Sequence, residues 1–327
     1  MTEAHAMTRT DPLPLRPRPS RRTLLAGAGL GAFAVATGGG TASARGAAEW
    51  PDAFSLPDGF QPEGITIGRG PYAYCGSLAD GSVYRADLRS GRGRIVHGGA
   101  EGAATVGLKL DRDGLLYLAG RDSGTVRVVD ARTGALVVTH EVAPDSEHFV
   151  NDGAVLGDRV WFTDSYAAVL YGVPRGGGRG RVRRLPLRGD WHQEPGVINA
   201  NGVVSAPDGA SLIVASSLPV GRLYRVDPRT GHAAALALRG VDDLLSADGL
   251  LRLGRTLYVV QNRLGVVSVL TLGAGATTAV LRRRIADPRF DTPTTAARHG
   301  DRLYVVNARF STPPAPDTPY TVVAVDR

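Results

Sequence analysis

A short apolar run that ends in a turn recurs six times along the chain. Taking Tyr74, Tyr117, Trp161, Ile213, Tyr258 and Tyr304 as landmarks, the successive intervals are 43, 44, 52, 45 and 46 residues. A period in the forties that is built from short strands is typical of a β-propeller with one four-stranded sheet, or blade, per repeat. Since one such blade cannot bury both of its faces alone, six of them must pack in a ring. We therefore expect an all-β fold, a six-bladed β-propeller.

The two ends of this repeat array indicate how the ring closes. The final repeat stops at Tyr320–Asp326 and lacks an outer strand. The segment Ala53–Gly59 lies before the first repeat, where an outer strand would stand, and it has no partner there. Joining the first and last blades removes exposed strand edges. The sequence therefore predicts that the N-terminal segment completes the last blade.

The first 44 residues have the anatomy of an export signal. A twin arginine (Arg21, Arg22) precedes an apolar stretch of 14 residues, Leu24–Thr37, and Ala42-Ser43-Ala44 fits a cleavage site. The stretch is shorter than the roughly 20 residues that a membrane-spanning helix needs. We expect a twin-arginine signal peptide at 1–44, a propeller at 45–327 and an extracytoplasmic location. An uncleaved anchor and a cytoplasmic leader are the alternatives.

Charge and cysteine content limit the possible partners. The leader holds five arginines and two acids, so it accounts for +3 of the formal net charge of +7. The arginine cluster within Arg175–Arg188 lies among glycines in an expected solvated hairpin, and it lacks the interleaved aromatic residues of a nucleic-acid groove. Cys75 is the only cysteine, which excludes an internal disulfide and a thiolate metal cluster and fits a buried structural thiol. We expect a monomer that binds a small molecule, without nucleic acid and without a membrane span after cleavage.

Each repeat opens with a pair of residues that we expect to form a turn at one end of the central channel. The six are Glu63-Gly64, Val106-Gly107, Asn151-Asp152-Gly153, Asn201-Gly202, Asp248-Gly249 and Thr295-Ala296. Four of them offer side-chain oxygen at equivalent places, namely Glu63, Asn151, Asn201 and Asp248. Carboxylate and amide oxygens without Cys or His suit a hard divalent cation.

The alternative is that these pairs are only turn dipeptides. We favour a metal site because convergent carboxylates repel one another unless a cation or a proton joins them. Ca²⁺ is the preferred cation, with Mg²⁺, Mn²⁺ or Zn²⁺ as alternatives.

At these motifs the chain resembles the SMP-30/gluconolactonase family of six-bladed, calcium-dependent lactonases. The resemblance spans about residues 53–327 and depends on the order and spacing of Pro62–Gly64, Asn151–Gly153 followed by Val160–Ser165, Asn201–Gly202 followed by Ser205–Gly209, and Ala247–Gly249. It implies that Glu63, Asn201 and Asp248 bind the metal. It also implies that Asn151 is shared between metal and substrate, and that Asp248 is the catalytic acid/base.

The expected pocket differs from that of the sugar lactonases in this family. Those enzymes carry an arginine two residues before the Asn-Asp-Gly motif to bind substrate hydroxyls, and this chain has Phe149 there. A more apolar substrate is therefore favoured. We expect Asn151, Phe149, His148 and Trp191 to contact substrate, with the extra loop Gly189–Asn199 near the mouth of the channel.

The function that best fits these residues is an exported, metal-dependent hydrolase of a lactone or a related ester. A hard cation activates water, and a carboxylate can accept the proton of that water. The chain has no Gly-x-Ser-x-Gly motif, so a covalent acyl-enzyme is not indicated. Two alternatives stay open: a non-catalytic binding or scaffold propeller with a structural ion, and a metal-free enzyme of the strictosidine-synthase type.

Overall fold

The computed structural model describes residues 50–144, 147–178 and 180–327. They belong to a unit that spans Ala47–Arg327. The expected signal peptide at 1–44 lies outside the described residues, so its prediction stays untested. No helix in the described ranges has the length and apolar character that a membrane span requires.

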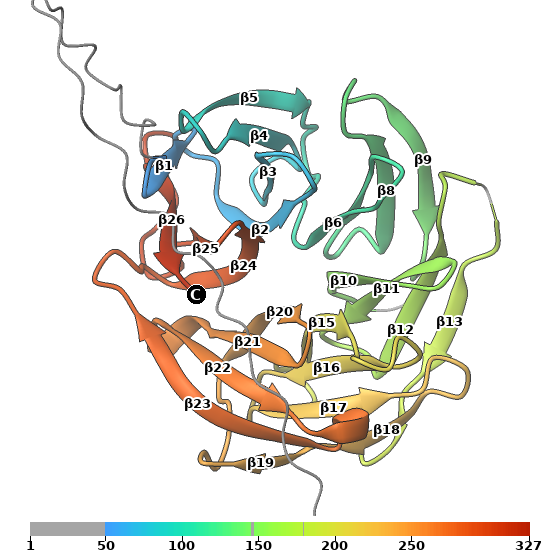
Figure 1. The fold of residues 1–327 in the computed structure, drawn as a ribbon. Helices are drawn as coiled ribbons and strands as arrows, with labels where there is room; N and C mark the ends of the chain where they lie inside the picture. The colour runs from blue at the N-terminus through green and yellow to red at the C-terminus, as the bar shows by residue number, and fades with distance from the viewer. Residues whose placement is uncertain (1–49, 145–146, 179) are drawn as a thin grey trace, which may run out of the picture. The chain divides into compact units, whose positions relative to one another are not determined.

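The described residues form six sheets arranged in a ring, which confirms the all-β, six-bladed propeller (Figure 1). The innermost strands β2 (Pro62–Ile67), β6 (Leu108–Leu110), β10 (Val150–Leu156), β15 (Ala200–Ser205), β20 (Ala247–Leu253) and β24 (Pro293–His299) surround the centre. The six landmark runs are the second strands, at β3 (Tyr72–Ser77), β7 (Leu115–Ala119), β11 (Arg159–Asp164), β16 (Leu212–Ser216), β21 (Thr256–Gln261) and β25 (Arg302–Asn307). Two short 3-10 helices, η1 (Asn262–Leu264) and η2 (Ala274–Ala276), lie in the loops of blade five.

The third and fourth strands complete each blade toward the outside of the ring. The third strands are β4 (Val83–Asp87), β8 (Thr125–Asp130), β12 (Val169–Pro174), β17 (Arg222–Val226), β22 (Val266–Leu272) and β26 (Tyr320–Asp326). The outer strands of blades one to five are β5 (Arg92–His97), β9 (Leu136–Glu141), β13 (Arg183–Pro186), β18 (His232–Ala235) and β23 (Thr278–Ala286). Blades four and five each gain a fifth, parallel strand at the outer edge, β14 (Arg188–Gly189) and β19 (Ala237–Arg239).

The N-terminal segment closes the ring, as the sequence predicts. Strand β1 (Ala53–Leu56) pairs antiparallel with β26, with Ala53 opposite Val323 and Leu56 opposite Tyr320. Blade six therefore combines one strand from the start of the described chain with three from its end (Figure 1). The pairing also covers the edge of β26, which would otherwise be open to other strands.

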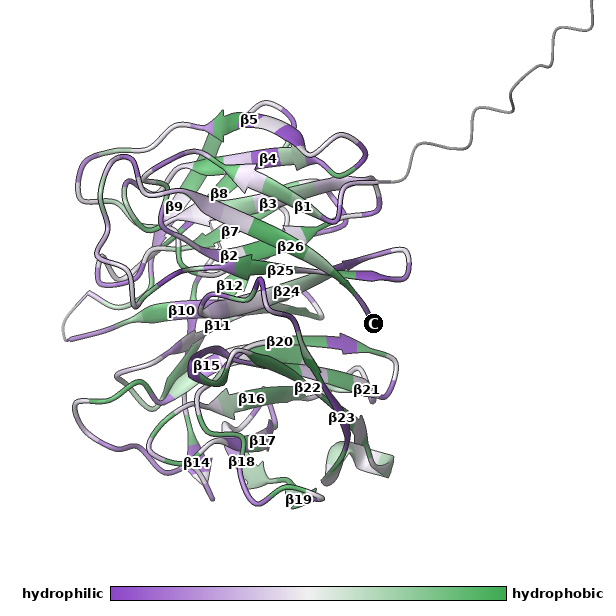
Figure 2. Cartoon of the chain, turned by 90° about the vertical axis from the view of Figure 1, so that its left-hand side faces the viewer, coloured by the Kyte–Doolittle hydropathy of each residue, from purple (hydrophilic) through white to green (hydrophobic). Residues whose placement is uncertain are grey.

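Six apolar clusters hold the ring together, one between each pair of neighbouring blades. The period-2 alternation of a strand explains this, because successive side chains point to opposite faces. Tyr74 packs toward blade two, whereas its neighbour Cys75 packs toward blade six. Figure 2 accordingly draws β16, β20 and β26 as hydrophobic over much of their length. Cys75 is fully buried and burial raises the pKa of its thiol, which confirms a structural role.

The residue–glycine pairs do not form turns; they lie in or beside the innermost strands. The register of five of these strands shifts there, so two residues face one on the partner, as in a β-bulge. None of the pair glycines has a positive φ. Glycine is needed for space: a Cβ on Gly107 would lie 2.6 Å from the Asn151 carbonyl oxygen, and one on Gly202 would collide with the Asp248 carbonyl oxygen. Small residues therefore let each innermost strand approach the next.

The arginine-rich hairpin of blade three is mostly exposed, with one difference from expectation. The side chain of Arg175 is only 14% exposed. Its Nε lies 3.7 Å from Oδ2 of the buried Asp111, and its Nη2 lies 3.4 Å from Oδ2 of Asp113. Arg175 therefore connects blade three to the blade-two turn, because a buried carboxylate needs a charged or hydrogen-bonding partner.

Candidate functional site

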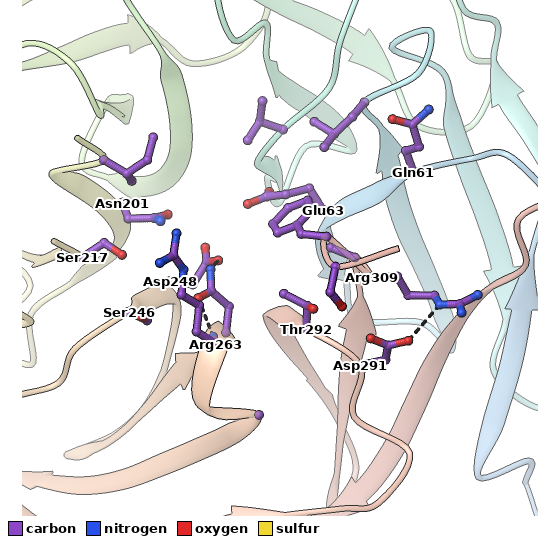
Figure 3. Close-up of a pocket in the computed structure, with 18 of the residues that line it drawn as sticks. Gln61, Glu63, Asn201, Ser217, Ser246, Asp248, Arg263, Asp291, Thr292 and Arg309 are labelled. Carbon is purple, nitrogen blue, oxygen red and sulfur yellow. Dashed lines mark hydrogen bonds and ion pairs between the residues drawn. The ribbon is translucent and has the colours of Figure 1, made fainter. Parts of the chain in front are cut away.

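A cavity of about 900 Å³ opens at one end of the ring, and residues from all six blades line it. The four predicted oxygen donors Glu63, Asn151, Asn201 and Asp248 are all among the lining residues. Each of the four is buried, between 2% and 6% exposed. Figure 3 shows Glu63 extending into the cavity from one side, with Asn201 and Asp248 on the other. The structure thus brings together four residues that span 185 positions of the chain.

The β-bulges explain why these side chains occupy equivalent places. In each of four blades the donor is the first of the two extra residues, at Glu63, Asn151, Asn201 and Asp248. A bulge turns the strand and redirects a side chain that would otherwise follow the pleat. In blade six the register makes Thr294 the equivalent residue, where we had expected Thr295. Thr294 donates to the Glu63 carbonyl oxygen at 2.6 Å and so fixes the backbone of the first donor.

Three of the donor oxygens have no hydrogen-bond partner although they are buried. They are Oδ1 of Asn151, Oδ1 of Asn201 and Oδ1 of Asp248. The orientation of the Asn151 amide follows from its neighbour Ser165, whose hydroxyl donates to the Ala200 carbonyl at 2.7 Å. That hydroxyl can then only accept from Nδ2 of Asn151, at 2.9 Å, which leaves the amide oxygen free. Buried polar atoms are rarely left unpaired, so these three indicate a ligand or an ion.

Both carboxyl groups of the site have raised pKa values. Burial raises the pKa of Asp248 to about 7, and the charge of Asp152 adds to that rise. Hydrogen bonds act against it, among them one from Asn262 Nδ2 to Asp248 Oδ2 at 2.6 Å. Burial raises the pKa of Glu63 well above its usual range, helped by the charges of Asp248 and Asp152. Negative charge at this place is therefore unfavourable until a positive charge joins it.

A third buried carboxylate lies next to the donors and has its own support. Asp152 is 5% exposed, and its oxygens accept from the backbone nitrogens of Gly153 at 2.8 Å and Val203 at 3.3 Å. Burial raises the pKa of Asp152, while the positive charge of Lys109 lowers it. Asp152 does not line the cavity. Its role is structural: it binds the innermost strand of blade three to that of blade four.

The donor set fits a hard divalent cation. Two carboxylates and two amide oxygens converge, and three of the oxygens are free to coordinate. The described residues contain no group of three or more His, Cys, Asp or Glu side chains in metal-binding proximity. A site of this kind therefore depends on the neutral amides Asn151 and Asn201, which suits Ca²⁺ or Mg²⁺ better than zinc or copper.

Of the remaining residues expected to contact substrate, one lines the cavity and two do not. Phe149 lines the cavity and packs edge-on against Tyr166, with ring centroids 5.6 Å apart. His148 and Trp191 are not among the lining residues. Trp191 packs on Tyr224 of blade four at 4.8 Å, because the segment around it joins β14 to the outer edge of that blade. Ile198, near the end of the extra loop, does reach the cavity.

Many lining residues were not expected, and five of them share an unusual backbone. Six residues other than glycine have a positive φ in the described chain, and five of them line the cavity: Gln61, Arg121, Ser246, Thr292 and Arg309. Such conformations cost about 1–3 kcal/mol each and are concentrated at functional sites. Arg121, Asn262, Arg263 and Arg309 follow the second strands of their blades by one or two residues. Their place directly after the landmark runs is the signal that could have identified them.

No protein-family model and no curated protein sequence matches the chain. Solved structures similar in fold include the Malassezia sympodialis allergen Mala s 1, at 15% identity and a TM-score of 0.68 over 85% of this chain and 97% of that one. Regucalcin from Agrobacterium tumefaciens, described as a calcium-binding protein, has 20% identity and a TM-score of 0.59 over 83% and 92%. A PQQ-bound aldose sugar dehydrogenase from Streptomyces coelicolor has 13% identity and a TM-score of 0.58 over 85% and 100%. At these identities the likeness shows the β-propeller fold alone, and the fold is shared by enzymes and by proteins of other kinds.

Proposed function

We propose that the protein is a divalent-cation-dependent hydrolase of a lactone or a related ester. One observation carries the proposal: three buried side-chain oxygens without partners converge with the Glu63 carboxylate in one cavity. The fold neighbour regucalcin, a member of the SMP-30 family to which the motifs of this chain are similar, supports a cation of the Ca²⁺ type. The cavity is large enough for a small-molecule ester beside the cation.

The residues of the chain divide into holding and proton-transfer roles. Glu63, Asn151, Asn201 and Asp248 would hold the cation. When bound, a cation of this kind polarises an ester carbonyl and lowers the pKa of a neighbouring water. Asp248 is the proposed acid/base, because its carboxylate belongs to the donor set that would hold the cation and, in its ionised form, can accept the proton of an activated water. Asn262 keeps one carboxylate oxygen of Asp248 fixed and leaves the other without a hydrogen-bond partner.

A lactone and aryl-ester panel tests the proposal. We expect turnover that a chelator abolishes, that added Ca²⁺ restores, and that Asp248→Asn reduces at least tenfold. Glu101→Gln, which removes an exposed carboxylate outside the cavity, is the matched control and should retain full activity. No turnover of the whole panel, together with a chelator-induced loss of thermal stability, would instead favour a binding or scaffold propeller with a structural ion.

We also propose export by the twin-arginine route, from the motif at Arg21 and Arg22. Fractionation of cells that produce the full chain should place the protein outside the cytoplasm. Replacing both arginines by lysine should retain it inside, and an unchanged distribution would contradict the proposal.

A further inference from the structure

Two arginines of the cavity wall have no part in the reaction proposed above. Arg121 follows the second strand of blade two, and Arg263 lies in η1 after the second strand of blade five. Blades two and five are three apart in a ring of six, so the segments that carry the two residues lie on opposite sides of the ring. Both are exposed. Arg309, in blade six, is a third arginine of the same wall.

The backbone holds Arg121 beside the oxygen donors. Its nitrogen donates to the Val150 carbonyl at 3.2 Å, and the Val150 nitrogen donates back to the Arg121 carbonyl at 3.0 Å. Val150 precedes Asn151, so the register of Arg121 relative to a donor is fixed. Its guanidinium lies 5.5 Å from the ring centroid of Phe149. A guanidinium that stacks on an aromatic face keeps its N–H groups available for an anion at its edge.

Arg263 is held next to the other side of the site. The preceding residue, Asn262, donates through Nδ2 to Asp248, and its Oδ1 accepts from the Arg263 backbone nitrogen at 2.6 Å. Figure 3 accordingly shows Arg263 on the Asp248 side of the cavity, with Arg309 and Asp291 on the other side.

The charges of the described residues leave these two guanidinium groups uncompensated. Arg309 donates through Nε to Asp291 at 2.8 Å, whereas neither Arg121 nor Arg263 has an ion-pair partner within the described ranges. Lys109 offsets the buried Asp152. A divalent cation would offset the two carboxylates of the donor set. The cavity would then carry a surplus of two positive charges, both on its wall.

Apolar surface adjoins this positive wall. Leu264 and Phe310 line the cavity, and each is 54% exposed. Phe149 and Phe290 line it as well. Exposed side chains of this size beside a cavity are typical of a place that an apolar ligand covers.

We propose that Arg121 and Arg263 form an anion subsite, and that the substrate is an ester or lactone that carries both a carboxylate and an apolar group. The proposal deepens the proposed hydrolase and rests on it for the reaction, but the subsite itself can be tested without turnover. The two guanidinium groups attract the carboxylate of the substrate from the two sides of the cavity, the apolar residues cover the remainder, and the ester carbonyl faces the oxygen donors.

The test uses inert probes of matched shape, 4-phenylbutyrate and its neutral amide 4-phenylbutyramide. Calorimetry with the whole protein in excess Ca²⁺ should give at least tenfold tighter binding of the carboxylate. Arg121→Gln and Arg263→Gln should each reduce that preference at least threefold, and the double variant should abolish it. Arg94→Gln, on the exposed outer strand β5, is the matched charge control and should change nothing. A melting curve for each variant establishes that it is folded.

Three results would overturn the subsite. They are equal affinity for the two probes, an undiminished preference in the double variant, and a preference that a chelator abolishes but the arginine variants do not, since the carboxylate would then bind the cation. Because the probes are not hydrolysed, these outcomes are independent of turnover. A protein that prefers the carboxylate but hydrolyses nothing would refute the hydrolase and retain the subsite. A protein that hydrolyses esters yet binds both probes equally would refute the subsite and retain the hydrolase.

Discussion

Removing the cation should make the stability of this protein depend on pH in an unusual direction. The pKa of Asp248 rises from its ordinary value of 3.8 to about 7 in the fold. A folded state that holds a proton more tightly than the unfolded chain loses stability as pH rises from the unfolded pKa to the folded one. Each pKa unit corresponds to roughly 1.4 kcal/mol, so Asp248 alone contributes a loss of about 4 kcal/mol between pH 4 and pH 7. The raised pKa of Glu63 acts in the same direction.

The assay is thermal or urea unfolding in chelator between pH 4 and pH 8, for the natural protein and for Asp248→Asn. His140 has the opposite effect on stability over part of this range. Burial lowers its pKa in the folded protein, so its contribution to stability is lost as pH falls. The variant retains His140, so the difference between the two pH profiles reports Asp248 together with its effect on the neighbouring Glu63. In a domain of this size a change of 4 kcal/mol shifts the melting temperature by roughly 10 °C. Saturating Ca²⁺ should abolish the difference, since it binds the ionised form. Superimposable profiles in chelator would refute the reasoning.

Three further outcomes follow from the fold and the site. A chain that lacks residues 45–60 loses β1 and should melt at a sharply lower temperature than the chain beginning at 45, so equal melting curves would contradict ring closure through β1. Gly202→Ala should destabilise by about 1–3 kcal/mol, because its methyl group would collide with the neighbouring innermost strand, whereas Gly178→Ala meets nothing within 4 Å and should be neutral; urea unfolding compares them. Ser165→Ala should weaken Ca²⁺ binding by about tenfold, measured by calorimetry, because it frees the Asn151 amide to rotate; unchanged affinity would remove Asn151 from the site.

The repeat period was sufficient to predict the ring, and the reason is physical. A blade of alternating strands has two apolar faces, so each repeat requires a neighbour on both sides, and Tyr74 and Cys75 serve one neighbour each. The unpaired segment beginning at Ala53 could likewise have only one partner, the strand that lacked one. The donor positions were predictable because each occupies the same place in its repeat. Their local structure was not, since residue–glycine pairs occur in turns and in bulges alike.

The rest of the cavity depends on features that the sequence does not encode locally. Arg121 and Arg309 adopt a left-handed backbone that their residue type does not favour, so only the surrounding structure places them at the cavity. Trp191, in contrast, was expected near the cavity and lies away from it. Its loop was expected to reach the mouth of the channel, but a two-strand parallel pairing and a ring contact with Tyr224 hold it against the outside of blade four. Long-range contacts of this kind follow from packing, which no single segment determines.

In the bulges of the innermost strands, close packing of the blades and the presentation of oxygen to an ion depend on different residues. In blade four, the backbone register and Gly202 maintain the approach of the neighbouring innermost strand, whereas the side chain of Asn201, the first residue of the bulge, lines the cavity. Exchanging an amide for a carboxylate at Asn201, or for a hydroxyl, would change the charge presented to a ligand without disturbing closure. Single substitutions at such positions can therefore create, alter or remove an ion site in a propeller of this kind, while the fold stays the same.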